Sequence, residues 1–232
     1  WDRQWGRNSP QLHQRRARWL VKTLLNLGPT FIKIGQALSS RADLLPPEYV
    51  QALSQLQDRV PAFCADEAIA LIESELKNSI HALFREFEHT PIAAASLGQV
   101  HRARLHTGED VVVKVQRPGL ERLFNLDFLA LAKLVQFCNK YFAWARKYSL
   151  DRLYQEFRNL IYQEIDYIQE GKNADKFRDN FTAYPRVLVP QVYWRYTTKK
   201  VLVLEYLPGV KINDRPTIER LGIDVKELNR VG

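Results

Sequence analysis

The 232-residue sequence predicts an α+β protein in which helices precede and interrupt an antiparallel sheet. Three observations lead to this prediction. Apolar residues repeat with helical spacing over 11–78, and the pattern changes to strand alternation from about residue 83. A short turn at 106–109 joins two strands into a hairpin, which makes them antiparallel. Long helical stretches then separate these strands from two more near residue 200. The antiparallel hairpin excludes a doubly wound parallel sheet.

Four helices are expected before the sheet, over 11–27, 30–40, 46–59 and 67–78. Gly28-Pro29 separates the first two, because Gly ends helices and Pro cannot continue one. Pro61 ends the third, and Asp66 is the expected N-cap of the fourth. The apolar faces are expected to contain Leu20, Leu24 and Leu27, then Phe31, Ile34 and Leu38, then Tyr49, Leu53 and Leu56, then Ile69, Ile72 and Leu76.

Five strands are expected in two groups. The first group covers 83–88 and 91–116, and the hairpin turn at 106–109 divides the second of these stretches. Helices over 120–147 and roughly 150–178 follow the Pro118-Gly119 pair. Two further strands, over 187–196 and 200–206, flank a turn at 197–198. The tail from residue 213 reads as a loop followed by a helix.

Composition excludes several classes of protein. Apolar residues make up 46% and charged residues 26%, which is ordinary for a globular chain and rules out a disordered chain, a collagen and a coiled-coil rod. The net charge of +8 allows a nucleotide, a nucleic acid or an acidic membrane surface as partner, without choosing among them. Aromatic residues are scattered over apolar faces without a readable stacking platform, so nucleic-acid binding is not expected.

Cysteine usage and the chain ends bound the cellular context. Cys64 and Cys138 lack metal-ligand spacing, so we expect two buried free thiols in a reducing compartment and no metal site. The sequence has neither a signal peptide nor a stretch of about 18 apolar residues that could span a membrane. It begins with Trp1 and contains no Met, so we expect a piece of a longer protein.

Lys114 is the residue that points most directly to chemistry. It lies in the run Val111-Val112-Val113-Lys114-Val115, where a cation carries a desolvation cost unless an anion pairs with it. The alternative is an edge-strand lysine that points to water. Before it, the small residues of 93–100 would let backbone N–H groups approach a phosphate, although they also suit a tight strand crossing. Together these features match the nucleotide-binding layout of a protein-kinase small lobe.

Three acidic residues could pair with Lys114 or with another cation. Asp166 and Glu170 are four residues apart on one helix face, and Glu164 points some 200° away from Asp166 by the helical period of about 3.6 residues. They could also form a solvated acidic face. Lys33 and Gln36 share a helix face around Gly35, which fits either a functional site or a surface lysine beside a helix crossing.

Five motifs, in this order along the chain, resemble the UbiB/ADCK family of atypical kinases, over about residues 28–215. Lys33-Ile34-Gly35-Gln36 resembles the family's KxGQ element and is followed by Ser39, Arg41, Asp43-Leu44-Leu45-Pro46 and Leu56-Gln57-Asp58. The other four are the alanine-rich loop Ala93-Ala94-Ala95-Ser96, the lysine segment Val113–Gly119, the ExD element Glu164-Ile165-Asp166 and the hinge Val203–Leu207.

The resemblance implies a division into three parts and an adenine-nucleotide site. Residues 1–82 would form an N-terminal helical extension, 83–207 a kinase-like small lobe with a helical insertion at 118–150, and 208–232 the start of a connection to a large lobe that this chain lacks. ATP or ADP would be cradled by Ile92, Ala93, Ala94, Ala95, Ser96, Leu97, Gly98, Gln99 and Val100. Alanine in place of glycine would stiffen this loop.

The resemblance also implies roles for single residues. Lys114 would contact the α- and β-phosphates and pair with Glu170, and the main chain of Glu205 and Leu207 would bind the adenine edge. Glu164 and Asp166 would meet Lys33, with Gln36 beside it, where a peptide lies in ordinary kinases, which favours a small or lipidic substrate. The residues expected to act in catalysis are Lys33, Gln36, Glu164, Asp166 and Glu170.

The segments that carry the catalytic Asp and the metal-binding residues of the large lobe are absent from the sequence. Catalysis by this chain alone and Mg²⁺ binding without the large lobe are therefore not expected. The intact protein is expected to be an atypical kinase or ATPase that supports isoprenoid quinone biosynthesis, of the ubiquinone or plastoquinone type, or lipid metabolism.

A non-catalytic docking module remains the alternative function. In that case helices within 11–60, with Arg15, Arg16 and Arg18, would bind a membrane or a partner, prenylquinone-pathway proteins among them. The style of the motifs favours a membrane-associated protein of a bacterial cytoplasm or plastid over one of a mitochondrion. The oligomeric state stays open.

Overall fold

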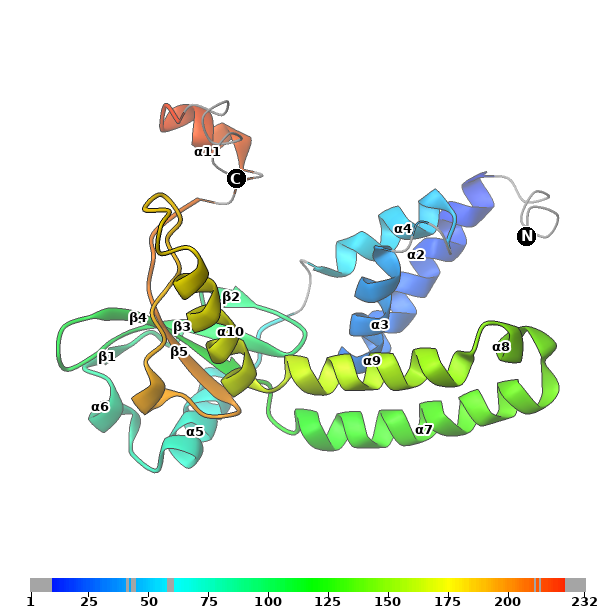
Figure 1. The fold of residues 1–232 in the computed structure, drawn as a ribbon, viewed down its shortest axis with the longest axis horizontal. Helices are drawn as coiled ribbons and strands as arrows, with labels where there is room; N and C mark the ends of the chain where they lie inside the picture. The colour runs from blue at the N-terminus through cyan, green and yellow to red at the C-terminus, as the bar shows by residue number, and fades with distance from the viewer. Residues whose placement is uncertain are drawn as a thin grey trace.

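The computed structural model describes residues 10–40, 42, 45–57, 61–210, 212 and 214–223. It confirms the α+β class, with a helical N-terminal part, an antiparallel sheet and a long helical hairpin that projects away from the sheet (Figure 1). Arg41, Asp43, Leu44 and Asp58 of the motifs lie outside the described residues, as does the tail after 223.

The N-terminal extension is a three-helix unit with its own core. It consists of α2 (Pro10–Leu27), α3 (Pro29–Ser39), α4 (Pro47–Ser54) and the 3-10 turn η1 (Gln55–Gln57). Gly28 has φ 101°, a conformation that favours glycine, and thereby turns α2 into α3. Leu24, Ile32, Leu53 and Leu56 form the core.

The inward face of α3 differs from the predicted one. Ile32 and Gly35 are buried, whereas Ile34 is half-buried. A Cβ at Gly35 would lie 2.4 Å from a Leu56 methyl group and 2.9 Å from one of Leu24, so this glycine lets α3 pack closely on its neighbours. Gly35 therefore lies at a helix crossing, on the buried face of α3.

Two helices lead from the extension into the sheet. In α5 (Ala65–Leu76), Cys64 is the N-cap rather than Asp66, which lies in the first turn where its charge favours the helix dipole. The short helix α6 (Ile80–Leu83) was not predicted, and it ends at Leu83, where the first strand was expected to begin. Cys64 is exposed and Cys138 half-buried, so the expectation of two buried thiols is wrong.

The sheet has five antiparallel strands: β1 (Glu86–Phe87), β2 (Ala93–Ala94), β3 (Gly98–Arg104), β4 (Asp110–Gln116) and β5 (Val201–Glu205). Their order is β1-β3-β4-β5, with β2 paired to β3. The register places Lys114 between Val100 of β3 and Leu202 of β5. Alternate valines of β4, Val111, Val113 and Val115, are fully buried in a core shared with α5 and α6, which leaves Lys114 on the opposite face.

The strand predicted over 187–196 is wrong, although the sheet contains five strands as predicted. Segment 187–196 contributes only an isolated bridge between Val192 and Leu204 and the 3-10 turn η2 (Trp194–Tyr196). The fifth strand arises because the stretch 91–105 divides into β2 and β3. Proline at 185 and 190 fits this outcome, since proline cannot donate to a strand ladder.

The long helices are also divided. The predicted helix 120–147 breaks at Phe142 into α7 (Leu120–Tyr141) and α8 (Ala143–Lys147). The next one breaks at 165–166 into α9 (Leu150–Glu164), which runs back along α7, and α10 (Tyr167–Asn180), which packs on β5 (Figure 1). Phe124, Phe128 and Ile161 form the core of this hairpin. A last helix, α11 (Arg215–Arg220), follows the sheet.

None of the helices in the described ranges is both long and apolar enough to cross a membrane.

Candidate functional site

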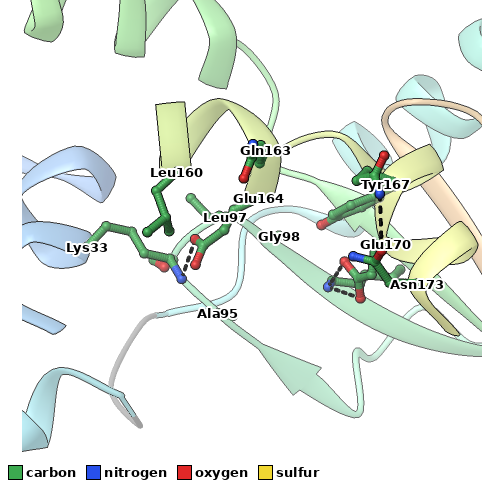
Figure 2. A pocket seen from close by; sticks show the side chains of 13 residues that line it. Lys33, Ala95, Leu97, Gly98, Leu160, Gln163, Glu164, Tyr167, Glu170 and Asn173 are labelled. Atoms are coloured by element: carbon green, nitrogen blue, oxygen red, sulfur yellow. Dashed lines mark hydrogen bonds and ion pairs between the residues drawn. The ribbon is translucent and has the colours of Figure 1, made fainter. Parts of the chain in front are cut away.

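A pocket of about 730 Å³ lies where the turn before β3, the end of α9, the start of α10 and α3 meet (Figure 2). It brings together eight of the residues predicted to form the site: Lys33, Ala95, Ser96, Leu97, Gly98, Lys114, Glu164 and Glu170. These come from four separate parts of the sequence, so the fold assembles the pocket rather than any local motif.

Lys114 and Glu170 form an ion pair at this pocket. The ammonium Nζ of Lys114 lies 2.7 Å from both carboxylate oxygens of Glu170, in the first turn of α10. The Lys114 side chain is 31% exposed, and its Nζ also lies 4.7 Å from the centre of the Tyr167 ring. The predicted pairing of Lys114 with Glu170 is therefore present. The alternative, an edge-strand lysine that points to water, is wrong.

Tyr167 supports this ion pair and was missed by the sequence reading. It is 1% exposed, and its hydroxyl makes no hydrogen bond among the residues that the structure describes. Burial raises the pKa of this hydroxyl well above its usual value, with the Glu170 charge adding to the shift. A Cβ at Gly98 would lie 2.8 Å from the Tyr167 hydroxyl and 2.3 Å from the Val115 carbonyl, so only glycine fits there.

The turn that precedes β3 lines the pocket and contains two backbone N–H groups without an acceptor in the described chain. The Ala95 N–H donates to the Gly98 carbonyl at 2.8 Å, which closes the turn. Within the described chain, no acceptor lies within hydrogen-bond distance of the N–H groups of Ser96 and Leu97. Two such donors beside a lysine form the kind of concave site that binds an anion.

The rest of the predicted cradle lies away from the pocket. Ala93 and Ala94 pair with β3 as strand β2, and neither Ile92 nor Val100 lines the pocket. The Gln99 side chain is fully buried, where its carbonyl oxygen accepts from the Phe63 N–H at 3.0 Å and its amide lies 2.9 Å from His101. The cradle is therefore confined to Ala95, Ser96, Leu97 and Gly98.

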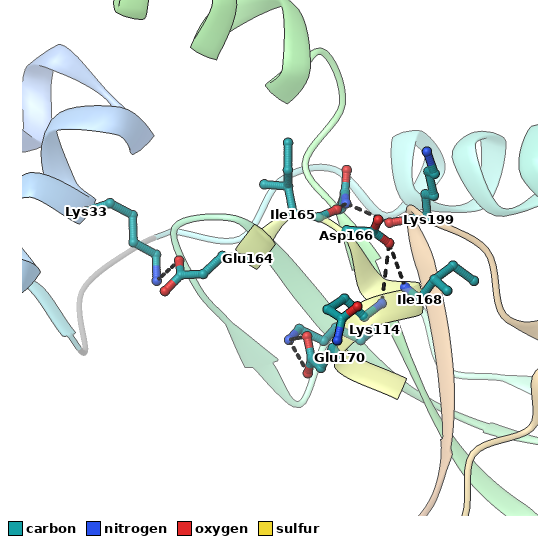
Figure 3. Close-up of polar contacts among 10 residues, drawn as sticks. Lys33, Lys114, Glu164, Ile165, Asp166, Ile168, Glu170 and Lys199 are labelled. Atoms are coloured by element: carbon teal, nitrogen blue, oxygen red, sulfur yellow. Dashed lines mark hydrogen bonds and ion pairs between the residues drawn. The ribbon is translucent and has the colours of Figure 1, made fainter. Parts of the chain in front are cut away.

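A second ion pair closes the opposite side of the pocket. Lys33 Nζ of α3 lies 2.7 Å from a carboxylate oxygen of Glu164, the last residue of α9 (Figure 3). The Lys33 side chain is 21% exposed. This pair ties the N-terminal extension directly to the edge of the pocket.

Asp166 does not meet Lys33, contrary to the prediction. It is the N-cap of α10, where its side chain accepts from the N–H groups of Ile168 at 3.0 Å and Gln169 at 3.4 Å (Figure 3). The prediction treated the segment as one helix, on which Asp166 and Glu170 would share a face. Because the helix breaks at Ile165, the carboxylate of Asp166 caps α10, whereas the carboxylate of Glu170 pairs with Lys114.

Gln36 and Gln116 hold the surroundings of the pocket in place. The Gln36 amide donates to the Leu56 carbonyl at 3.0 Å, so Gln36 stabilises the extension and does not line the pocket. The buried Gln116 amide donates to the carbonyls of Ile165 and, at 2.9 Å, of Lys199. It therefore fixes the break between α9 and α10 against the turn before β5.

Glu205 and Leu207 do not line the pocket. The Glu205 N–H donates to the Gln191 carbonyl at 2.9 Å, and the Glu205 carboxylate accepts from the Gln191 N–H at 3.2 Å. The Glu205 N–H is therefore already bonded within the chain. The predicted contact of this segment with an adenine edge remains a prediction.

Besides Tyr167, the sequence reading missed four residues that line the pocket: Leu160, Gln163, Gln169 and Asn173. Helical spacing from Glu170 could have found two of the five, because Tyr167 and Asn173 lie three residues before and after it. The Gln169 amide donates to Asn173 at 3.1 Å, so these amides form a polar wall.

Nowhere in the described ranges do three His, Cys, Asp or Glu side chains gather as metal ligands would.

Comparisons with known proteins agree with this geometry. A family model described as the ABC1 atypical kinase-like domain matches residues 55–232. An uncharacterized protein of Synechocystis sp. is 56% identical over 236 residues, which cover 100% of this chain and 42% of that protein. The Arabidopsis thaliana protein Activity of BC1 Complex Kinase 7, chloroplastic, is 52% identical over 90% of this chain and 30% of its own length.

Two further matches extend to other bacteria. The probable protein kinase UbiB of Azotobacter vinelandii is 41% identical over 94% of this chain and 41% of its own length. A Mycobacterium tuberculosis protein, solved as a complex with erythromycin, has a TM-score of 0.58 and 28% identity over 86% of this chain and 50% of that chain. The chain thus spans between about a third and a half of the length of these relatives.

Proposed function

This chain belongs to the ABC1/UbiB family of atypical kinases, and we propose on that premise that it forms the nucleotide-binding part of an atypical kinase or ATPase. The observation that carries the proposal is the ion pair between Lys114 and Glu170 beside the turn at 95–98. A lysine that is held by a helix carboxylate next to backbone donors is the arrangement with which kinases orient the phosphates of ATP.

Three features of the pocket fit a polyphosphate. The Lys114 ammonium supplies the cation, and the N–H groups of Ser96 and Leu97 are available as donors. Gly98 allows the turn to lie directly against Val115 and Tyr167. The carboxylates of Glu164 and Glu170 are each paired with a lysine, so the lysine charges offset their repulsion of a bound anion. We therefore assign the phosphate end of ATP or ADP to this side of the pocket.

The chemistry of the whole protein is part of the proposal. Bound ATP would supply the γ-phosphoryl group, for transfer or for hydrolysis. Lys114 would orient its phosphates, and Glu170 would hold Lys114 in position. Mg²⁺ ligands and the catalytic base are proposed to come from the large lobe of the longer protein, because kinases carry them there.

We propose isoprenoid quinone biosynthesis or lipid metabolism as the process served. The ion pair between Lys33 and Glu164 supports a small or lipidic substrate, because it closes the pocket on the side where kinases admit a peptide. The relatives of known source are chloroplastic or bacterial, which supports a plastid-type or bacterial setting, and we propose association with a membrane there.

The test is nucleotide binding by the 232-residue chain. Titration calorimetry with ATP and ADP, with and without Mg²⁺, should detect binding that Lys114→Ala weakens by about tenfold to a hundredfold, the usual range for a lost hydrogen bond from a charged group. Lys133→Ala, which removes an exposed lysine of α7, is the matched control and should bind as the unchanged protein does.

Two results would contradict the nucleotide site. One is equal affinity in the unchanged protein and in a folded Lys114→Ala variant, with folding checked by circular dichroism. The other is the absence of nucleotide binding both by this chain and by the longer protein. The second result, together with membrane or partner binding that depends on Arg15, Arg16 and Arg18, would favour the alternative of a docking module.

A further inference from the structure

The end of the helical hairpin at which α7, α8 and α9 meet (Figure 1) carries an exposed aromatic cluster. We name it the aromatic tip. Its members lie at the end of α7, in α8 and just after it, and each is between 40% and 59% exposed: Phe137, Tyr141, Phe142, Trp144 and Tyr148. Monomeric proteins rarely expose contiguous apolar groups of this size without a binding purpose.

Four of the five rings of the aromatic tip form a continuous series of contacts. The ring centre of Phe137 lies 4.7 Å from that of Tyr141 and 6.3 Å from that of Phe142. Phe142 in turn lies 6.2 Å from Trp144. Nearby, Ala145 of α8 is buried, whereas Trp144, the aromatic residue of this short helix, is exposed.

The charges around the aromatic tip are mainly positive, although the carboxylate of Asp151, in the first turn of α9, accepts a hydrogen bond from the Asn139 amide there. Residues 133–149 contain four cations and no Asp or Glu: Lys133, Lys140, Arg146 and Lys147. Arg146 donates to the carbonyl of Asn139 at 2.5 Å and so closes the end of α7. Lys140 and Lys147 form no ion pair with any carboxylate of the described chain and lie against the rings of Tyr141 and Tyr148.

We infer that the aromatic tip is a docking surface for an anionic lipid bilayer. Trp and Tyr beside Lys and Arg is the composition that settles at the interface between headgroups and hydrocarbon, where the rings enter the membrane and the cations reach the headgroups. An anionic surface attracts Lys140 and Lys147, and the four cations of 133–149 outweigh the neighbouring carboxylate of Asp151. A protein partner fits less well, because lysine is depleted at protein interfaces.

Contact between the aromatic tip and a membrane would not obstruct the pocket. The pocket lies at the other end of α9, so a membrane at the tip would leave the pocket open. This surface differs from the α2 arginines, which belong to the alternative docking hypothesis. The inference does not depend on nucleotide binding, and the two can fail separately.

The experiment is vesicle flotation of the 232-residue chain. We expect it to float with vesicles of phosphatidylcholine and phosphatidylglycerol, to float less with phosphatidylcholine alone, and to be released by salt. Lys140→Gln with Lys147→Gln should weaken binding to the anionic vesicles by about fivefold for each cation removed. Phe137→Ser with Trp144→Ser should weaken binding to both kinds of vesicle.

Matched controls separate the aromatic tip from other exposed groups. Leu188→Ser removes a side chain that is 74% exposed elsewhere and should leave flotation unchanged. Replacement of Arg15, Arg16 and Arg18 by Gln should also have little effect. As a second readout, vesicles should shift tryptophan emission to the blue, and Trp144→Phe should abolish that shift while it preserves flotation.

Three outcomes would overturn the inference. The first is that the chain does not float with anionic vesicles, or that the tip variants float equally well. The second is that only the α2 arginine variant loses binding. The third is self-association through the tip, detected by light scattering and lost in the Phe137 and Trp144 variant, without flotation. The tip variants should retain nucleotide affinity, which keeps this result separate from the test of Lys114.

Discussion

At the scale of single residues, the sheet core determines the protonation state of His101. Its ring is fully buried and stacks on Phe87, with 5.0 Å between ring centres. Because the Gln99 carbonyl accepts from Phe63, the Gln99 amide faces His101 Nε2, which must accept. Nδ1–H then donates to the Glu88 carbonyl at 2.8 Å. The network therefore requires a neutral ring, and burial lowers the pKa of His101.

This lowered pKa predicts an acid-sensitive core. Above the ordinary histidine pKa of 6.5, neither the folded nor the unfolded chain binds the proton, and the contribution of His101 is fully present. As the pH falls below this value, the unfolded chain takes up the proton first. The free energy of unfolding should therefore decrease by up to about 1.4 kcal/mol per pH unit.

Urea denaturation at several pH values measures this dependence. His101→Gln should flatten it, although the variant is also less stable at neutral pH. His81→Gln, which changes an exposed histidine, should preserve the slope. An unchanged slope in His101→Gln would show that other groups cause the acid sensitivity.

At the scale of secondary-structure elements, the break between α9 and α10 determines the geometry of the pocket. It ends α9 at Glu164, which faces Lys33, and begins α10 so that Glu170 lies in its first turn and faces Lys114. Asp166 caps the new helix, and Gln116 bonds the carbonyl of Ile165 at the break. One interruption thus directs two carboxylates toward two different lysines.

Loss of the cap should destabilise this arrangement. Asp166→Ala leaves the first N–H groups of α10 without their side-chain acceptor, which should lower the free energy of unfolding by about 1 kcal/mol. Asp166→Asn keeps an oxygen acceptor and should cost much less. Urea unfolding of the two variants measures the difference, and an equal cost for both would contradict the capping role.

The sequence predicted the elements whose pattern is local and failed where tertiary contacts decide. The helices at 10–39 and the hairpin at 98–116 follow from periodicity. The cost of burying a cation predicts an acidic partner for Lys114, but it left three acids open, and the family resemblance pointed to Glu170. The break at Ile165 was not predicted, although Asp166 is a favoured N-cap residue. Long-range bonds hold the break: Gln116 donates to the Ile165 carbonyl, and the Tyr167 N–H donates to the Lys199 carbonyl. Segment 187–196 has strand composition, but its prolines leave it only a bridge.

At the scale of the whole molecule, polar bonds connect parts with separate cores. The extension packs around Leu53 and Leu56, whereas the sheet packs around the valines of β4. Two contacts cross from α3 to the hairpin: Lys33 pairs with Glu164, and the Thr30 hydroxyl donates to Asp127. Lys33 and Glu164 line the pocket, whereas Thr30 and Asp127 do not.

The ion pair between Lys33 and Glu164 should therefore couple the extension to the lobe. A double-mutant cycle with Lys33→Ala and Glu164→Ala should give a coupling free energy of about 0.5–1 kcal/mol, modest because the Glu164 side chain is 36% exposed. This coupling should shrink as salt is added. The cycle is measured by urea unfolding, and additive effects of the two substitutions would show that the pair does not hold the parts together.

The segment before β5 has a consequence for the behaviour of the protein at high concentration. The outer edge of β5 is already occupied, because Gln191 and Tyr193 exchange backbone hydrogen bonds with Glu205 and Val203 on either side of the Val192 bridge. A second molecule therefore finds no free ladder there on which to add a strand, and edge-to-edge aggregation through β5 is blocked.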